Sequence, residues 1–236
     1  LKVSMSKEET AFYEAMRQTA LENVENEDQH PGQKHFLILA ELTKLRQACC
    51  HPRMIHPQSK LQSSKLDLLQ DIISELMANG HKALVFSQFV KHLALVRERL
   101  DSLDIDYRYL DGSTPAQDRE KEITAFQSGQ GDLFLISLKA GGQGLNLTAA
   151  DYVIHLDPWW NPAVEDQATD RTHRIGQKNP VTVYRLVAEN TVEEKIVQLH
   201  TEKRELADSL LEGSDISTKV SSDQLMRLVQ NDAQLI

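Results

Sequence analysis

The sequence predicts an α/β fold with a parallel sheet, because short β-rich runs alternate with segments of helical periodicity through the middle of the chain. The runs are Lys82–Ser87, Asp106–Leu110, Leu133–Ser137, Tyr152–Leu156 and Val181–Val187. Strands that alternate with helices form βαβ units, in which the strands are parallel and helices cover both faces of the sheet. We therefore expect a sheet of at least five strands, enough for a complete small α/β domain.

Apolar residues at helical spacing mark the helices of this domain. They are Leu66, Leu69, Ile73 and Leu76 in one helix, and Leu93, Val96, Leu100 and Leu103 in the next. A third helix is predicted to open with Thr114 as its N-cap and Pro115 in its first turn, because the first turn of a helix tolerates a residue without an N–H donor. The predicted strands are thus mostly separated by helices.

The chain before this domain reads as two helices joined by a solvated loop. Helical spacing over 4–23 and 35–50 surrounds an acidic stretch at 22–33 that contains Pro31 and Gly32. A polar linker follows at 58–64.

After the last predicted strand, Thr191-Val-Glu-Glu194 forms a capping box for a long amphipathic helix that stops near Gly213. The polar tail beyond it carries Leu225, Leu228 and Val229, which indicate a short helix that either docks or stays mobile. The predicted domains are 1–62, a helical extension with its linker; 63–190, the α/β domain; 191–212, the long helix; and 213–236, the tail.

Composition argues against a membrane or secreted protein. The chain has 236 residues, 40% apolar and 26% charged, a globular balance. Its apolar runs are too short to cross a bilayer, and no signal peptide opens it. Because it begins with Leu1 rather than methionine, we expect it to be part of a longer protein. The two cysteines, Cys49 and Cys50, are adjacent, which fits a reducing compartment rather than a disulfide framework.

The charge balance argues against a strong stand-alone nucleic-acid binder. Lysine and arginine number 26 and aspartate and glutamate 35, a net charge of −9. Affinity for phosphate comes mainly from basic side chains, so we expect weak DNA binding by this chain alone. Contact through a local patch or through backbone amides remains open.

The segment Ser137-Leu-Lys-Ala-Gly-Gly-Gln-Gly-Leu-Asn-Leu147 follows the third predicted strand, at an edge where open parallel sheets bind ligands. Its glycines allow the backbone to approach a phosphate and direct amides at it. A dinucleotide fingerprint is excluded, because that pattern requires a third glycine where Leu147 stands and belongs to the first βα unit. A phosphate-contacting loop and a tight structural loop both remain open.

The segment 161–176 carries the signals of one helix, with an asparagine N-cap and a proline at its start and a glycine at its end. On such a helix Gln167, Arg171 and Arg174 lie within about 60° of arc. Arginine suits anion binding, because its planar fork grips phosphate oxygens and stays charged. The alternative is an ordinary solvated face paired with neighbouring aspartates.

Other candidate sites have less support. The segment Cys49-Cys50-His51 with His56 lacks the two-residue spacer of zinc sites, so no metal site is predicted. Trp159-Trp160 could stack on bases, although a hydrophobic anchor between lobes is favoured. The sequence has no Gly-x4-Gly-Lys-[Ser/Thr] loop and no Asp-Glu-x-His after a strand. It therefore lacks a phosphate cradle and magnesium ligands of its own.

Six segments in chain order resemble the Swi/Snf-type DNA-dependent ATPases of helicase superfamily two. They are Leu45–Pro52, Ala83–Gln88 (motif IV), Leu110–Pro115, Ser137–Leu147 (motif V), Leu156–Pro162 and Asp166–Gln177 (motif VI). The resemblance covers nearly the whole chain but only the second RecA-like lobe; the first lobe, with its phosphate loop, is absent from the sequence. It makes 1–50 part of a helical protrusion and 191–212 a brace helix. The Cys-Cys-His-Pro variant is similar to bacterial members.

The resemblance implies roles for particular residues. The catalytic candidates are Arg171 and Arg174, which match motif VI arginines that reach a γ-phosphate held by the first lobe, with Arg174 as the finger. The nucleotide-binding candidates are Gln167, Gly144 and Asn146. The DNA-binding candidates are Ser137, Lys139, Gly141, Gly142, Ser87, Gln88, Asp111, Gly112 and Ser113.

The function implied by the resemblance is that of the second motor lobe of an ATP-driven translocase or remodeller on double-stranded DNA. ATP with magnesium would be held mainly by the first lobe of the same polypeptide, so this chain alone is expected to be inactive, monomeric and unattached to membranes. The expected location is the cytoplasm and nucleoid of a bacterium, or a nucleus.

Two alternatives from other classes stay open. One is a non-catalytic protein-docking module derived from the same lobe. The other is a stand-alone enzyme such as a nucleotide-sugar transferase, against which the broken glycine pattern and the lack of a catalytic base both argue.

Overall fold

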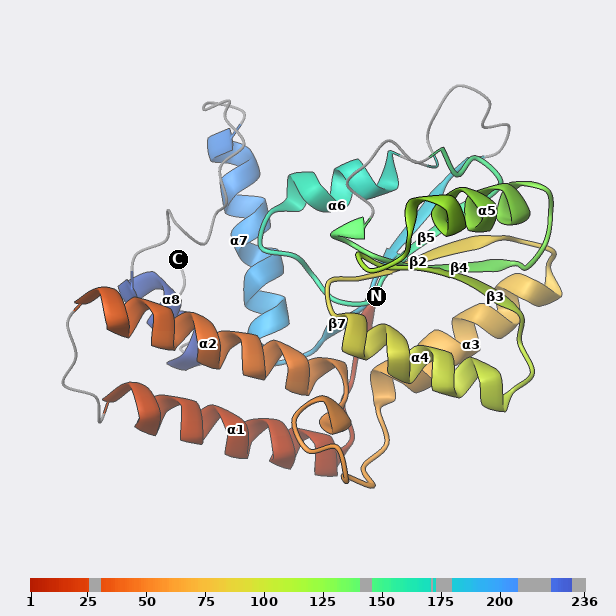
Figure 1. Cartoon of the computed structure of the whole chain (residues 1–236). Coiled ribbons are helices and arrows are strands. Elements are labelled where there is room, and N and C mark those ends of the chain that lie inside the picture. Colours follow the sequence, from red (N-terminus) through yellow and green to blue (C-terminus); the bar gives the residue numbers. More distant parts are fainter. Residues whose placement is uncertain (26–30, 141–145, 171, 173–179, 208–221, 231–236) are drawn as a thin grey trace. The chain divides into compact units, whose positions relative to one another are not determined.

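The computed structural model describes residues 1–25, 31–140, 146–170, 172, 180–207 and 222–230 (Figure 1). The chain divides into two compact units. Residue 1 and residues 66–186 form an α/β unit, and residues 2–65 and 187–236 form a second, mainly helical unit. Within the described residues, no helix has the length and apolar character needed to cross a bilayer.

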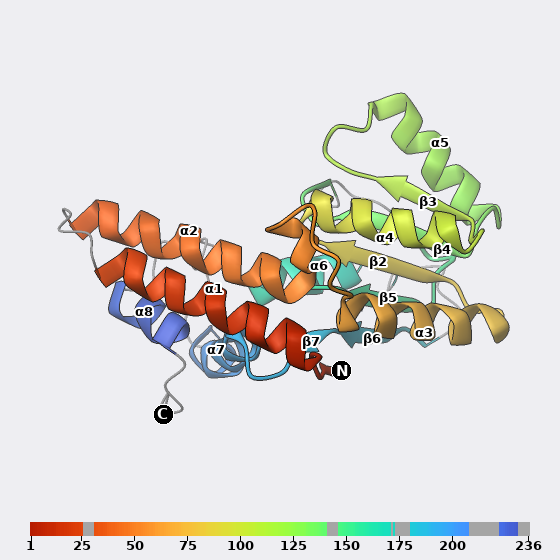
Figure 2. The same ribbon diagram turned by 90° about the horizontal axis from the view of Figure 1, so that it is seen from below.

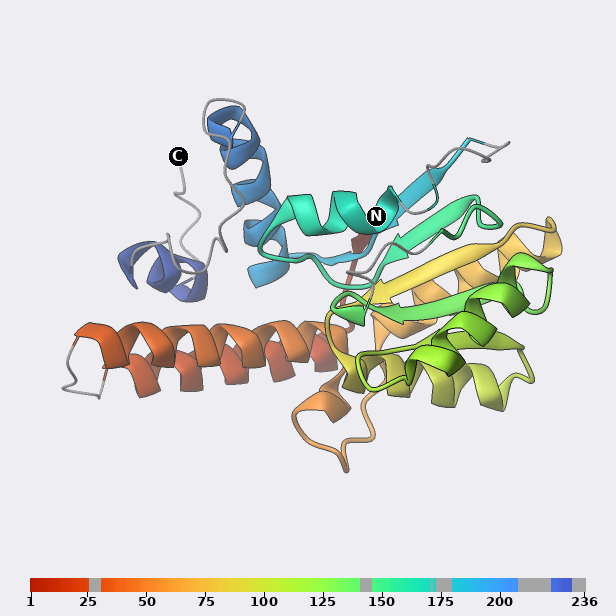
Figure 3. The same ribbon diagram turned by 45° about the horizontal axis from the view of Figure 1, so that its top comes forward.

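The α/β unit contains the predicted sheet of five parallel strands, which lie side by side in Figure 3. The strands are β2 (Ala83–Ser87), β3 (Tyr107–Leu110), β4 (Leu133–Ser137), β5 (Tyr152–His155) and β6 (Thr182–Arg185). Their order across the sheet is β3-β4-β2-β5-β6, and every neighbouring pair is parallel. The predicted fold class is confirmed.

Helices cover both faces of this sheet. They are α3 (Ser64–Ala78), α4 (Val90–Ser102), α5 (Ala116–Gln127) and α6 (Pro162–Thr169). Figure 1 shows α5 and α6 on one face and α3 and α4 on the other. Every residue of β2 and β4 is buried, as expected for strands covered on both sides. On the α5 face, Phe86 and Phe134 of the sheet pack with Phe126 of α5, and each such buried side chain contributes about 1.5–3 kcal/mol.

The start of α5 differs from the prediction. The helix begins at Ala116 with Pro115 at its N-cap, and no side chain caps it. The Thr114 hydroxyl instead accepts a hydrogen bond from the backbone N–H of Asp111 at 3.0 Å. Threonine hydroxyls can bond to nearby backbone groups in turns. Here the Thr114 hydroxyl binds within the turn that precedes α5 and does not cap the helix.

The helical unit contains helices of different lengths and a two-stranded sheet. The helices are α1 (Lys7–Glu25), α2 (Pro31–Cys50), the short 3-10 helix η1 (Pro52–Met54), α7 (Val192–Ala207) and α8 (Ser222–Gln230). Figure 2 shows α1 and α2 side by side, with α8 beside them. The predicted short tail helix is therefore docked: Leu225, Leu228 and Val229 are buried, and Arg17 of α1 donates to the carbonyl of Val229 at 3.2 Å.

The run predicted as one strand over 181–187 is divided in two. After β6, Val187–Ala188 forms β7, which pairs in parallel with β1 (Lys2–Val3) in a separate two-stranded sheet. The backbone N–H of Glu189 continues this pairing by donating to Val3 at 2.9 Å. The partner strand has two residues, too few to show an alternating pattern in the sequence.

The predicted capping box at the start of α7 forms in a modified way. The Thr191 hydroxyl accepts from the N–H of Glu193 at 3.2 Å, but Glu194 reaches back to the N–H of Asn190, at 2.7 Å, rather than to that of Thr191. Glu193 turns inward and forms a buried ion pair with Lys65 at the start of α3. Thr191 and Glu194 therefore bind backbone N–H groups at the start of α7, while Glu193 pairs with Lys65 in the interior of the helical unit.

Candidate functional site

The carboxyl ends of the parallel strands bring several candidate residues to one edge of the sheet. Ser87 at the end of β2 pairs in register with Ser137 at the end of β4. On the other side of β4, Leu110 pairs with Ile136, so that Asp111 follows at the same level. The structure therefore gathers the segments that begin with Gln88, Asp111 and Leu138 at this edge, where ligands of open α/β sheets bind.

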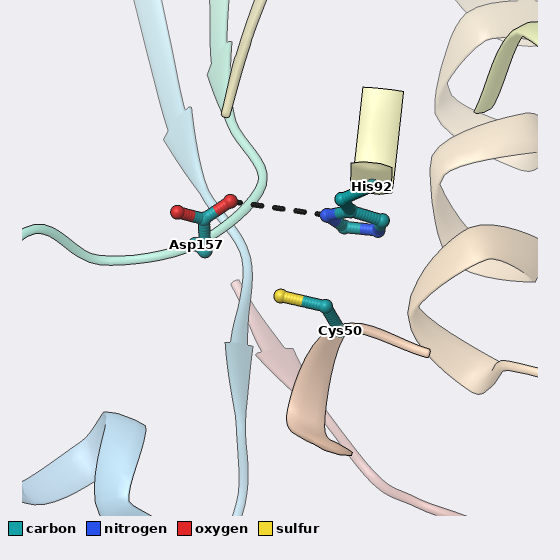
Figure 4. A group of neighbouring side chains, drawn as sticks. All are labelled: Cys50, His92 and Asp157. Atoms are coloured by element: carbon teal, nitrogen blue, oxygen red, sulfur yellow. Dashed lines mark ion pairs between the residues drawn. The ribbon is translucent and has the colours of Figure 1, made fainter. Parts of the chain in front are cut away.

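A buried carboxylate organises the end of β2. Asp157, in the loop after β5, accepts a hydrogen bond from the Ser87 hydroxyl and another from the backbone N–H of Gln88 at 3.2 Å. Figure 4 shows its carboxylate facing the ring of His92 on α4, with Nδ1 at 3.8 Å from Oδ2. Ser87 is fully buried, so its hydroxyl joins two loops and is not presented to a ligand. In the sequence, Asp157 directly follows the predicted strand Tyr152–Leu156 and carries no signal of this role.

Asp111 also has an internal role. Its carboxylate accepts hydrogen bonds from the Tyr109 hydroxyl at 2.7 Å and from the Ser113 hydroxyl and N–H at 2.6 and 2.8 Å. Burial would raise the pKa of Asp111, but these hydrogen bonds outweigh burial and lower it. The resulting turn exposes Gly112 and Ser113 beside an open hollow of about 380 Å³.

The glycine-rich segment begins at the end of β4. The buried Ser137 hydroxyl accepts from the N–H of Ala140 at 3.3 Å, and the N–H of Leu138 donates to the Ser87 carbonyl at 2.9 Å. Lys139 between them is exposed, as is Asn146. The candidates Gly141, Gly142 and Gly144 lie outside the described residues.

The helix predicted over 161–176 is shorter than expected. Asn161 caps α6 by accepting from the N–H of Ala163 at 3.0 Å, as predicted, but α6 ends at Thr169. The hydroxyl of Thr172 donates to the Thr169 carbonyl at 2.6 Å, a local bond that competes with helix continuation. Gln167 is exposed on α6, while Arg171 and Arg174 lie outside the described residues.

A buried glutamate holds α6 in place. Glu165 accepts from the backbone N–H of Trp159 and from Nε of Arg185 on β6, both at 2.7 Å. Burial raises the pKa of Glu165, and the Arg185 guanidinium acts against this rise. Trp159 packs against the apolar core that contains Ala168 of α6, and its predicted role as an anchor between lobes stays a prediction. The helix that leads into motif VI thus starts from a rigid base.

His155 connects the end of β5 with the end of α6. Its ring stacks on Phe86 with centroids 5.6 Å apart, and its Nε2 lies 3.2 Å from the hydroxyl of Thr169. Burial lowers the pKa of His155 to about 4, and the Arg185 guanidinium adds to the effect. The ring is therefore neutral at pH 7. This role of His155 has no signal in the sequence, where it is a single histidine within the predicted strand Tyr152–Leu156.

The cysteine–histidine segment has structural partners. His51 caps η1 by accepting from the N–H of Arg53 at 3.1 Å, and His56 packs edge-on against Phe12. Cys49 is buried, and burial raises the pKa of its thiol.

Known helicases and ATPases are similar to this chain in sequence and in structure. The model of the helicase conserved C-terminal domain matches residues 64–176. The chain is 39% identical over 93% of its length to an uncharacterized ATP-dependent helicase of Mycoplasma pneumoniae, and 33% identical over 96% to the putative ATP-dependent helicase/translocase YwqA of Bacillus subtilis. It spans 21% and 25% of these two relatives.

Two solved structures of the Sulfolobus solfataricus SWI2/SNF2 ATPase share the fold. Its C-terminal domain has a TM-score of 0.78 and 29% identity, covering 99% of this chain and 97% of that one. Its ATPase core in complex with double-stranded DNA has a TM-score of 0.79 and 32% identity, covering 97% of this chain and 48% of that one. The chain belongs to the SWI2/SNF2 family, and it forms the C-terminal RecA-like lobe of that family's ATPase core.

Proposed function

We propose that this chain is the second motor lobe of an ATP-driven translocase on double-stranded DNA. The observation that carries the proposal is the sheet edge at which motif IV, the turn at Asp111 and motif V meet in register. The likeness over nearly the whole chain to an ATPase core solved with double-stranded DNA supports it. Because the chain covers about a quarter or less of its relatives, the activity belongs to a longer polypeptide.

We divide the candidate DNA-binding residues by the exposure of their side chains. The side chains of Ser87, Ser137 and Asp111 are buried and engaged with neighbouring protein groups. We assign them the task of holding the edge loops. Direct phosphate contact falls to the exposed Ser113 and Lys139, together with backbone amides in the same loops. Contacts of this kind position a protein on DNA without reading bases.

The arginines of motif VI would complete the nucleotide site. The sequence contains no phosphate loop and no Asp-Glu box, so the nucleotide with its magnesium would be held by the first lobe. Arg171 and Arg174 follow α6 in the chain. The hydrogen bond from Arg185 of β6 to Glu165 of α6 holds this helix in place. When the cleft between the lobes closes, Arg174 would stabilise charge on the γ-phosphate, an effect worth about 10³–10⁵ in rate. Cycles of closure and opening would move the two lobes along the duplex.

The intact protein tests this proposal directly. We expect ATP hydrolysis that is stimulated by duplex DNA, and we expect this chain alone to hydrolyse no ATP. Adding the first lobe of the same polypeptide should restore activity. A chain that binds a protein partner but never restores hydrolysis would support the docking-module alternative instead.

A further inference from the structure

Helix α5 contacts the chain on both sides of the glycine-rich part of motif V. Near the start of α5, Nη1 of Arg119 donates a hydrogen bond to the carbonyl of Ala140 at 3.1 Å. At its end, Nε2 of Gln127 donates to the carbonyl of Asn146 at 3.0 Å. Ala140 and Asn146 are the described residues on either side of 141–145, and one helix is hydrogen-bonded to both of them.

The exposed side-chain amide of Gln127 makes further contacts beyond Asn146. Its Oε1 accepts from the backbone N–H of Ala149 at 2.8 Å, and its Nε2 also lies 3.3 Å from the hydroxyl of Thr148. The side-chain amide therefore binds the backbone on both sides of Leu147, which is fully buried. Ordering a long exposed side chain costs conformational entropy, which these hydrogen bonds must offset. The arrangement fixes the backbone that carries Asn146.

The helix itself is firmly seated. Phe126, the residue before Gln127, is fully buried and packs on Phe134 of β4 with ring centroids 5.3 Å apart. Strand β4 is the strand from which motif V departs. Gln127 lies eight positions after Arg119, about 12 Å further along the helix axis. They act from one rigid body on two points of the same loop.

We propose that Arg119 and Gln127 are positioning residues for motif V, an inference that rests on the proposed function. Arg119 sets Ala140 and hence the neighbouring exposed Lys139, to which the proposed function gives a DNA contact. Gln127 sets the exposed Asn146, to which the resemblance gives a nucleotide contact. The two residues therefore control different ligands, although they lie on the same helix. A general loss of folding would affect both ligands together.

The test compares single variants of the intact protein. Gln127→Ala should raise the KM for ATP roughly tenfold while the DNA concentration for half-maximal stimulation stays the same. Arg119→Ala should do the reverse, and Arg119→Lys, which keeps an N–H donor, should recover part of the loss. The matched control is Gln130→Ala, an exposed glutamine just beyond the same helix. Equal shifts of both parameters in either variant, or values equal to the control, would overturn the proposal.

A second measurement separates this proposal from the proposed function. The amide of Ala149 donates to Gln127, so its hydrogen exchange should accelerate in Gln127→Ala and stay unchanged in Gln130→Ala. This readout needs no catalysis. If the wild-type protein hydrolyses no ATP, the motor assignment fails while amide exchange still decides whether Gln127 holds the loop. Unchanged exchange at Ala149 would remove the positioning role itself.

Discussion

The ammonium nitrogen of Lys65 lies 2.7 Å from both carboxylate oxygens of Glu193, and both side chains are fully buried. The same carboxylate accepts from the backbone N–H of Ala188 at 2.9 Å. Burial alone would lower the pKa of Lys65, but the Glu193 carboxylate outweighs burial and raises it. This pair joins the start of α3 to the start of α7, in the interior of the helical unit.

Removing one partner of this pair should be more damaging than removing both. We expect Glu193→Gln or Lys65→Met to cost about 3–5 kcal/mol of unfolding free energy, because each leaves a buried charge uncompensated. The double variant Lys65→Met/Glu193→Leu should be less destabilised than either single variant. The Lys2–Glu194 pair is the control, and Lys2→Met should leave the unfolding free energy nearly unchanged because Lys2 is exposed. Denaturant titration measures these values, and additive losses would contradict the account.

Ser87 should matter for stability rather than for DNA affinity. Ser87→Ala leaves an oxygen of Asp157 without its hydroxyl donor, so we expect a loss of about 1–3 kcal/mol. Ser74→Ala, at an exposed helix position, should change stability by less than about 0.5 kcal/mol. Thermal unfolding and a DNA titration of the intact protein check both parts. A drop in DNA affinity at unchanged stability would restore Ser87 to the contact surface.

His155 should make the α/β unit sensitive to mild acid. Its pKa is about 4 when folded and about 6.5 when unfolded, so the unfolded state binds more protons between these values. The contribution of His155 to the unfolding free energy is therefore fully present above pH 6.5. It is lost as the pH drops towards 4, by about 3 kcal/mol in all. His155→Gln should flatten this part of the curve, because it removes the titrating ring. Denaturation at several pH values makes the comparison.

Lys139 should contribute to DNA binding without sequence preference. In the intact protein, Lys139→Ala should weaken binding to all duplexes alike and reduce the slope of log affinity against log salt by about 1. Lys121→Ala is the control, because Lys121 is exposed and pairs with Asp118 on the outside of α5. Fluorescence anisotropy across a salt series separates the two. An unchanged slope for Lys139→Ala would place this lysine away from the phosphates.

The strands and helices of the α/β unit could be predicted because their apolar residues repeat with clear periods. The end of α6, the division of 181–187 and the cap of α5 could not be predicted, because each depends on hydrogen bonds to specific partners, such as Thr172 with Thr169 or Thr114 with Asp111. For the candidate site, the sequence predicted the strand ends that the sheet brings to one edge. It did not reveal that Ser87 is engaged with a carboxylate 70 residues away.

The most direct test of the motor assignment is the DNA-stimulated ATPase rate of the intact protein carrying Arg174→Ala. We expect hydrolysis to fall by about 10³-fold or more, with thermal stability and DNA affinity unchanged, because this guanidinium would act only on the transition state. Arg119→Ala, which disturbs motif V without touching motif VI, should retain far more activity. Near-normal turnover in folded Arg174→Ala would contradict the central claim that this lobe completes an ATPase site.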